Sequence, residues 1–324
     1  MKAIVVTEFG GPEILRVREV EVPAPGPGEV RIDVRNAGLN FIDIYERRGE
    51  LSKRLPYTPG REASGTVESV GEGVITVKPG DRVAYLGAPC AYAEQITVPA
   101  ENLFPIPDDL TFEQGAAFPL QGMTAHYLLH EYKKLAPGTI VLIHAAAGGM
   151  GLLLVQWAKH LGANVIGTTS TEGKARAAKE AGADHVILYT QQDFVEETKR
   201  LTNGHGADLI IDGVGKTTFA GNLEASAIRG HVVIYGAASG PADPIIPNFL
   251  SRKSLSVSGG MLNNYLLTPE ERSRRSNDVL NANRDGWLKL RIDRVFPLEQ
   301  APEAQRRLET RQSIGKILLR IGTD

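Results

Sequence analysis

The sequence predicts an α/β fold in which a doubly wound parallel sheet is inserted into a mostly β domain. Short strand-like runs separated by Pro and Gly turns occupy about the first 120 residues. From about 121 to 259, apolar runs alternate with helical patterns, and the remainder is mixed. Alternation of apolar strands with helices is typical of a parallel sheet covered on both faces. We therefore assign residues 1–120 and 260–324 to one domain and residues 121–259 to the other.

The first domain is predicted to be mostly β because turns interrupt short runs of β-branched and apolar residues. The interruptions at 23–28, 71–73 and 78–81 are rich in Pro and Gly. These residues fix or free the φ angle as turns require. The strands predicted between them cover residues 4–7, 29–34, 64–70 and 82–86.

The second domain is predicted from six apolar runs with helical patterns between them. The helix after the first run covers residues 149–160, where Leu152, Leu153, Val155 and Trp157 give a broad apolar face. Gly162 follows at the place where a helix C-cap is expected. The predicted strands are 139–145, 164–168, 185–188, 209–212, 231–235 and 255–258.

The C-terminal stretch is predicted to complete the first domain. It contains two charged helical patterns, at 269–282 and 302–310, and a final strand at 316–321. The basic residues Arg272, Arg274 and Arg275 lie beside Glu270, Glu271 and Asp278. This mixture of charges predicts a solvated helix face.

A glycine-rich turn joins the first strand of the second domain to its helix. Residues 146–151 read Ala-Ala-Gly-Gly-Met-Gly, close to the G-x-G-x-x-G fingerprint of Rossmann domains. Ala146 replaces the first glycine. Gly148 lets the backbone approach a pyrophosphate, and Gly151 lets the helix pack close to the strand. The pyrophosphate would then lie on free N–H groups at a helix N-terminus.

The end of the second strand predicts NADPH in preference to NADH. NAD enzymes place an acidic residue there to bind the ribose 2′-hydroxyl, but this sequence has Ser170. Thr168 and Thr169 also offer hydroxyls without charge, and Lys174 can meet a 2′-phosphate as a compact cation. Glu172 is nearby but lies past the predicted strand end.

Composition excludes several other classes of protein. The formal net charge is −2, with Lys and Arg dispersed along the chain, so we expect no nucleic-acid partner. No apolar run is long enough to cross a membrane, and no signal peptide is recognised. Cys90 is the single cysteine, which fits a reducing compartment and predicts a cytoplasmic protein. His126 and His130 lack a third nearby ligand, so we expect no metal site.

Several segments, in order, resemble the quinone oxidoreductase branch of the medium-chain dehydrogenase/reductase superfamily, whose members include ζ-crystallin. They are Asn40-Phe-Ile-Asp-Ile-Tyr45, residues 59–67, residues 78–83, the glycine turn from His144, and residues 315–319. The resemblance covers essentially the whole chain. It implies a GroES-like catalytic domain and an inserted Rossmann domain. Zinc enzymes of this superfamily hold catalytic zinc with Cys, His and Cys, and by position these fall on Asn40, Arg61 and Gln121, which cannot form that site.

The resemblance also implies a site for NADPH. Asn40 and Tyr45 would approach the nicotinamide and the substrate, and are the candidate catalytic residues. Lys316 is expected to reach a cofactor phosphate. The other candidate cofactor residues, ordered from the nicotinamide through the pyrophosphate to the adenosine end, are Gln121, Thr124, Gly236, Ala237, Gly259, Gly260, Met261, Ala147, Gly148, Gly149, Met150, Thr168, Ser170, Lys174 and Tyr189.

The implied activity is zinc-independent hydride transfer from NADPH to a quinone, with protons from water or from a hydroxyl such as that of Tyr45. A quinone is already a strong electrophile, so positioning can suffice. Two alternatives stay open: a zinc-free reductase of an activated C=C bond, and a non-catalytic, crystallin-like protein that binds NADPH. We also expect a homodimer, because the strand at 255–258 would lie at a sheet edge, where a partner often covers it.

Overall fold

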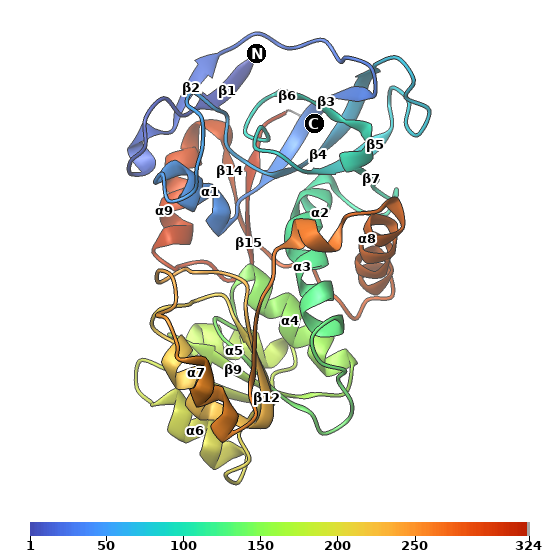
Figure 1. Ribbon diagram of the computed structural model, residues 1–324. Coiled ribbons are helices and arrows are strands. Elements are labelled where there is room, and N and C mark those ends of the chain that lie inside the picture. Colours follow the sequence, from blue (N-terminus) through green and yellow to red (C-terminus); the bar gives the residue numbers. More distant parts are fainter. Residues whose placement is uncertain (323–324) are drawn as a thin grey trace. The chain divides into compact units, whose positions relative to one another are not determined.

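The computed structural model describes residues 1–322, which form two compact units. Unit 1 contains Met1–Leu120 and the C-terminal segment from Leu290, and unit 2 contains Gln121–Lys289 (Figure 1). Residues 260–289 therefore belong to unit 2, whereas the sequence analysis gave them to the first domain. The physical reason is the packing of the helix at Pro269–Arg284, whose Val279 is fully buried and closes over Gly122.

The seven-stranded sheet of unit 1 brings its two chain segments together. Its order is β14-β15-β3-β4-β5-β7, with β6 also paired to β3, and β1 and β2 form a separate pair. Neighbours in the large sheet are antiparallel except β14 and β15, which are parallel. The bounds are β1 Lys2–Val5, β2 Arg16–Glu19, β3 Glu29–Gly38, β4 Glu62–Val70, β5 Arg82–Leu86, β6 Gln95–Pro99, β7 Leu103–Pro105, β14 Ile292–Pro297 and β15 Lys316–Arg320.

Three α-helices accompany this sheet: α1 (Phe41–Arg47), α2 (Phe112–Ala117) and α9 (Ala301–Glu309). The sequence analysis identified only the last of them. Helix α2 begins with a capping box, in which Thr111 accepts from the Gln114 backbone N–H, a signature that is visible in the sequence. Short 3₁₀ turns lie at Pro12–Ile14, Ala100–Asn102 and Leu298–Gln300.

Unit 2 is built on a six-stranded parallel sheet, which confirms the predicted doubly wound arrangement. Its order is β10-β9-β8-β11-β12-β13, so the direction of winding changes between β8 and β11. Ligands of such sheets bind at this switch point, beyond the carboxyl ends of the strands. The bounds are β8 Ile140–Ile143, β9 Asn164–Thr169, β10 His185–Leu188, β11 Ala207–Asp212, β12 Ser226–Ile234 and β13 Ser256–Gly259.

The helices of unit 2 are α3 Pro119–His130, α4 Gly149–His160, α5 Glu172–Glu180, α6 Phe194–Leu201, α7 Phe219–Ala225 and α8 Pro269–Arg284, with 3₁₀ turns at Pro247–Arg252 and Leu262–Tyr265. Helices α4 to α7 alternate with the strands from β8 to β12, while α3 precedes the sheet and α8 follows it in the chain. Helix α4 has the predicted bounds, and Gly162 follows it with φ +86°, a value that favours glycine. No helix among residues 1–322 combines the length and apolarity that crossing a membrane would require.

Candidate active site

The glycine turn between β8 and α4 is least crowded at Gly148. Gly148 is the N-cap residue of α4, with extended backbone angles. A Cβ placed on Gly148 would meet only the Ala145 carbonyl oxygen, at 3.3 Å, whereas one on Gly151 would lie 2.3 Å from that oxygen. Gly151 therefore permits the close packing of α4 on the turn, and Gly148 leaves a cradle before the free N–H groups of the helix. This geometry fits a pyrophosphate.

Gln121 lies over the same turn, from the start of α3. A Cβ on Gly149 would approach the Gln121 side-chain oxygen to 2.3 Å. Thr124, one turn further along α3, is 6% exposed. Of the remaining turn residues, Ala147 is buried, while Gly148, Gly149 and Met150 are half-buried. Of the residues 147–150 that are predicted to hold the pyrophosphate, Ala147 is thus enclosed, and the two glycines are partly accessible.

The candidate adenosine residues gather at the carboxyl ends of β9 and β10. The Ser170 carbonyl accepts from the Thr190 hydroxyl at 3.1 Å, and the Tyr189 backbone N–H donates to the Thr169 carbonyl at 3.1 Å. Tyr189 is 42% exposed. Lys174 lies in the first turn of α5, where its backbone N–H donates to the Thr171 hydroxyl. Ser170 and Tyr189 therefore lie on adjoining loops, and Lys174 lies at the start of the helix that follows Ser170.

A buried polar network supports the switch point, and the sequence analysis did not assign it. His144 directly follows β8, and its ring nitrogens lie 3.0 Å from the Thr168 hydroxyl and 2.7 Å from the Asn222 amide oxygen. The Asn222 amide nitrogen donates to Asp212, whose carboxylate also accepts the backbone N–H groups of Val214 and Gly215. Burial lowers the pKa of His144, which keeps the ring neutral. Thr168 is thus a member of this network rather than an exposed hydroxyl.

The loops after β11 and β12 are also fixed closely together. A Cβ on Gly236 would lie 2.9 Å from the Gly213 carbonyl oxygen. The Ala238 backbone N–H donates to the Gly213 carbonyl at 3.1 Å. Gly236 and Ala237 are half-buried. The backbone after β12, which carries the candidate cofactor residues Gly236 and Ala237, is therefore held close to the loop after β11.

In unit 1, Asn40 is held by a buried ion pair. Asn40 is the N-cap of α1 and is 5% exposed. Its side-chain nitrogen donates to Glu62 Oε1 at 2.7 Å, and its side-chain oxygen accepts from Lys316 Nζ at 2.8 Å. Lys316 also donates to Glu62 Oε1 at 2.5 Å and to the Leu39 carbonyl at 2.9 Å. These contacts fix the amide plane of Asn40.

The position of Lys316 corrects the prediction that it reaches a cofactor phosphate. Lys316 is 3% exposed, and its ammonium group has three oxygen partners. An ammonium group has three donors, so all of them are used within unit 1. Sequence reasoning missed Glu62, whose second carboxylate oxygen accepts from the Leu120 backbone N–H at 2.7 Å, in the first turn of α3. Glu62 therefore caps that helix as well as holding Asn40.

Tyr45 lies in the second turn of α1, half-buried, with its ring 6.2 Å from that of Phe41. The inner face of α1 carries Asp43, which is fully buried. Its Oδ2 accepts from the Asn40 backbone N–H and from the Tyr92 hydroxyl, each at 2.9 Å. Burial raises the pKa of Asp43 to about 7, although these two hydrogen bonds act in the opposite direction and lower it. Asp43 thus fixes the start of α1, the helix that carries Asn40 at its N-cap and Tyr45 in its second turn.

Arg61 is paired with a buried carboxylate of α1. Its guanidinium donates to Glu46, and Lys53 Nζ lies 3.3 Å from the same carboxylate oxygen. Asn40 is hydrogen-bonded as described above, and Gln121 lies over the glycine turn. Within residues 1–322 there is no group of three or more His, Cys, Asp or Glu side chains that could hold a metal ion.

Comparison with known proteins identifies both halves of the chain. Residues 26–108 match the family model of the alcohol dehydrogenase GroES-like domain, and residues 149–276 match that of the zinc-binding dehydrogenases. The chain is 41% identical to a 2-haloacrylate reductase from a Burkholderia species, over 98% of each sequence. It is 40% identical to a quinone oxidoreductase of Pseudomonas aeruginosa, over 98% of this chain and 99% of that one.

A solved structure agrees with these sequence matches. The structure of Escherichia coli quinone oxidoreductase complexed with NADPH superposes with a TM-score of 0.96 at 37% identity, covering 99% of this chain and 100% of that one. Together with the matched domains and the glycine turn, these similarities show that the chain belongs to the quinone oxidoreductase branch of the medium-chain dehydrogenase/reductase superfamily.

Proposed function

We propose that the protein is an NADPH-dependent quinone oxidoreductase that works without zinc. The observation that carries the proposal is the glycine turn, whose open cradle lies at the N-terminus of α4. Its relatives support the assignment, since one is named a quinone oxidoreductase and another was solved in complex with NADPH. When bound, NADPH supplies a hydride at its nicotinamide.

The protein's own residues would bind and orient the cofactor. The backbone of 147–150 would hold the pyrophosphate, while Ser170, Lys174 and Tyr189 would hold the adenosine end. Gln121, Thr124 and the loops at 236–237 and 259–261 would line the nicotinamide. For the residues that follow the strands, these assignments rest on their placement at the carboxyl ends of the parallel strands, where dinucleotides bind. Gln121 and Thr124 lie on α3 instead, and the contact of Gln121 with the glycine turn supports its assignment.

Asn40 and Tyr45 would act on the acceptor. Reduction of a quinone by one hydride leaves a hydroquinone anion, which one proton converts to the hydroquinone. Tyr45 or solvent would supply that proton. The Asn40 amide, oriented by Glu62 and Lys316, would position the reacting groups. Since an amide, a guanidinium and a second amide are no zinc ligands, the residues Asn40, Arg61 and Gln121 favour a mechanism that needs no metal.

The test is NADPH oxidation followed at 340 nm with a benzoquinone, a naphthoquinone, an enal and an alcohol–aldehyde pair. Each acceptor is repeated with NADH and with a chelator. We expect quinone turnover that prefers NADPH and is indifferent to the chelator. Chelator-sensitive aldehyde reduction would instead refute the zinc-free reading.

A second candidate function is reduction of an activated C=C bond. The 41% identity to a 2-haloacrylate reductase favours it specifically. The cofactor residues would be the same, but the product enolate needs a general acid. Turnover confined to the enal would move the protein to this class. Tight NADPH binding with no turnover on any acceptor would indicate the non-catalytic alternative.

Lys174 is expected to set the preference for NADPH. Replacing it by Met should weaken NADPH binding by roughly 10- to 100-fold and leave NADH binding nearly unchanged, because a charge-assisted hydrogen bond to the 2′-phosphate is worth about 1.5–3 kcal/mol. Lys179→Met, in the last turn of the same helix, is the matched control. Fluorescence titration of each variant with both cofactors measures the effect, and equal losses for both would exclude this role.

We also propose a homodimer in a reducing, cytoplasmic setting. Strand β13 lies at the edge of its sheet, and Ile228, Ile246 and Phe249 are exposed apolar side chains of the same unit. An exposed strand edge favours pairing with a second copy. Light scattering should give twice the chain mass of 35.0 kDa. The single cysteine, Cys90, fits the reducing setting.

A further inference from the structure

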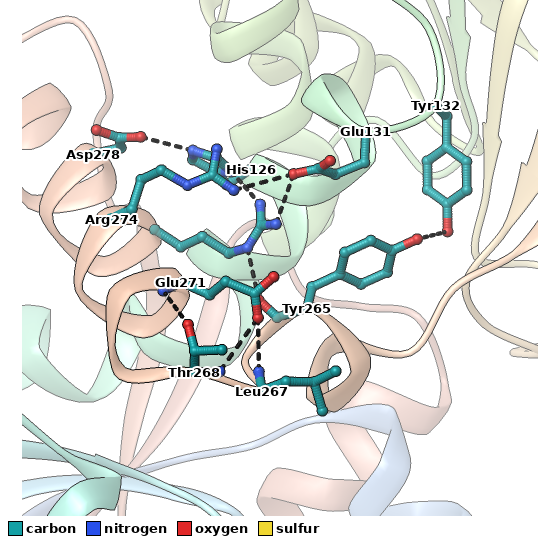
Figure 2. A network of polar contacts seen from close by, with 10 residues as sticks. His126, Glu131, Tyr132, Tyr265, Leu267, Thr268, Glu271, Arg274 and Asp278 are labelled. Carbon is teal, nitrogen blue, oxygen red and sulfur yellow. Dashed lines mark hydrogen bonds and ion pairs between the residues drawn. The ribbon is translucent and has the colours of Figure 1, made fainter.

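A buried arginine joins a polar network in unit 2, and Figure 2 shows its partners His126, Glu131 and Tyr265. Arg275, on α8, is 1% exposed. Its Nε donates to the Tyr265 carbonyl at 2.9 Å, one Nη to His126 Nδ1 at 2.8 Å, and the other to Glu131 at 2.6 Å. This corrects the prediction of a wholly solvated face for 272–275. A buried guanidinium is costly unless its donors are satisfied, and here all three nitrogens are.

The network also fixes the protonation of His126. Because Arg275 can only donate, His126 Nδ1 must accept, and the ring proton is on Nε2. That nitrogen lies 2.8 Å from an Asp278 carboxylate oxygen. Burial is the main cause that lowers the pKa of His126 to about 4, assisted by the nearby His130 and Arg275. The ring therefore stays neutral near pH 7, and the arrangement does not depend on a titration in that range.

The segment 259–266, between β13 and α8, is held at both ends by this network. At one end, the Tyr265 hydroxyl donates to the Tyr132 hydroxyl at 2.9 Å, which donates to the Gly259 carbonyl at 3.0 Å. At the other end, Arg275 binds the Tyr265 carbonyl, and Arg272 donates to that of Leu266 at 3.0 Å. The Tyr265 ring stacks on Tyr127, at 4.2 Å and 7°.

Between these anchors, the segment has little structure of its own. It contains one 3₁₀ turn, Leu262–Tyr265, and one backbone hydrogen bond to β12, from the Gly260 N–H to the Ile234 carbonyl at 3.3 Å, so the side-chain anchors add to a sparse set of backbone contacts. Gly260 packs directly against Tyr132, since a Cβ on Gly260 would be 2.4 Å from the Tyr132 hydroxyl oxygen. Met261 is 62% exposed, although Leu262 beside it is buried. The anchored segment thus presents an apolar side chain outward.

We propose that Arg275 is a positioning residue that keeps segment 259–266 in the shape in which Gly259, Gly260 and Met261 contact the nicotinamide and the acceptor. This role rests on the proposed function, because it assumes that the segment lines the reacting groups. Arg275 itself touches neither, since its side chain is enclosed by His126, Glu131 and Tyr265. It acts through the backbone carbonyl of Tyr265.

The test compares Arg275→Met with Arg274→Met in the full-length protein. Arg274 is the neighbouring residue and pairs with the same Glu131, at 3.3 Å, but its side chain is 53% exposed. Arg275→Met should raise amide hydrogen exchange in 259–266 by about tenfold or more, because local opening becomes easier. It should also raise KM for the quinone by roughly tenfold, a typical cost of one lost buried hydrogen bond. Arg274→Met should change neither.

Two further variants test the same role of the network. If Arg275→Met fails to fold, Tyr132→Phe, which removes one hydroxyl at the Gly259 anchor, should raise exchange near Gly259 and the acceptor KM in the same direction. Arg275→Lys should recover little, because the three acceptors are each bound by a different nitrogen of the planar guanidinium, and a compact ammonium cannot reproduce that fork. Faster exchange in 259–266 without any change in acceptor KM or kcat would overturn the proposal.

The outcomes also separate this proposal from the proposed function. If the wild-type protein turned over no acceptor, the proposed function would fail, and with it the kinetic role of Arg275. Normal quinone turnover in Arg275→Met, with exchange like that of Arg274→Met, would refute only the positioning role.

Discussion

Replacing Lys316 by Met is expected to destabilise the protein by about 3–5 kcal/mol, the usual cost of breaking a buried ion pair from one side. Glu62 is fully buried, so its carboxylate would keep only the donors of Asn40 and Leu120. Its negative charge would then lack a compensating cation. Guanidinium denaturation of the purified variants measures the loss.

The matched control is Lys78→Met. Lys78 also forms an ion pair, with Asp81 at 2.7 Å, but its side chain is 80% exposed. An exposed pair of this kind contributes little to stability, because solvent screens it. Adding Glu62→Gln to Lys316→Met should recover part of the lost stability, because the buried charge is gone. If Lys316→Met cost no more than Lys78→Met, the buried pair would have no structural role.

The double variant also separates stability from catalysis. With Glu62→Gln and Lys316→Met combined, the Asn40 side-chain oxygen has lost its lysine donor, although neither charge of the buried pair remains. We therefore expect folded protein whose kcat stays well below that of the wild type. Such a result would tie the orientation of Asn40 to turnover, independently of the stability of unit 1.

The fold was predictable where the signal is local. The alternation of apolar runs and the periodicity of 149–160 depend on residues a few positions apart, and they located all six strands of the parallel sheet and α4 within a few residues. The glycine turn is equally local. Helices α1 and α2 were missed because each is short, and a run of six or seven residues gives little periodicity.

The buried ionic groups could not be predicted because their partners are far away in the sequence. Lys316 and Glu62 are 254 positions apart, and Arg275 and His126 are 149 apart. Each lysine or arginine, taken alone, is more often a surface residue, which explains why Arg275 was interpreted as solvated and Lys316 as a phosphate ligand. Only tertiary packing shows that both cations are enclosed.

Gly148 and Gly151 are expected to respond to alanine in opposite ways, although both belong to the same fingerprint. At Gly151, a Cβ would lie 2.3 Å from the Ala145 carbonyl oxygen and 2.6 Å from backbone atoms of Ala146. Backbone atoms of a packed strand-to-helix turn cannot move aside cheaply, so Gly151→Ala should destabilise unit 2 by about 1–3 kcal/mol, as overpacking does. The readout is the unfolding free energy.

At Gly148 the same substitution should spare the fold and abolish tight NADPH binding. Its Cβ would meet only the Ala145 carbonyl oxygen, at 3.3 Å, a close contact that a shift of a few tenths of an ångström relieves, whereas the Cβ on Gly151 would lie at 2.3 Å from the same oxygen. The φ of −72° at Gly148 suits any residue. The methyl group would occupy the space in which the backbone must approach the pyrophosphate. We expect near-wild-type stability and a roughly 100-fold rise in the Kd for NADPH, since losing two hydrogen bonds to charged groups costs about 3 kcal/mol. Unchanged NADPH affinity in Gly148→Ala would mean that the cofactor does not lie at this turn, because a methyl group on Gly148 would otherwise collide with the pyrophosphate.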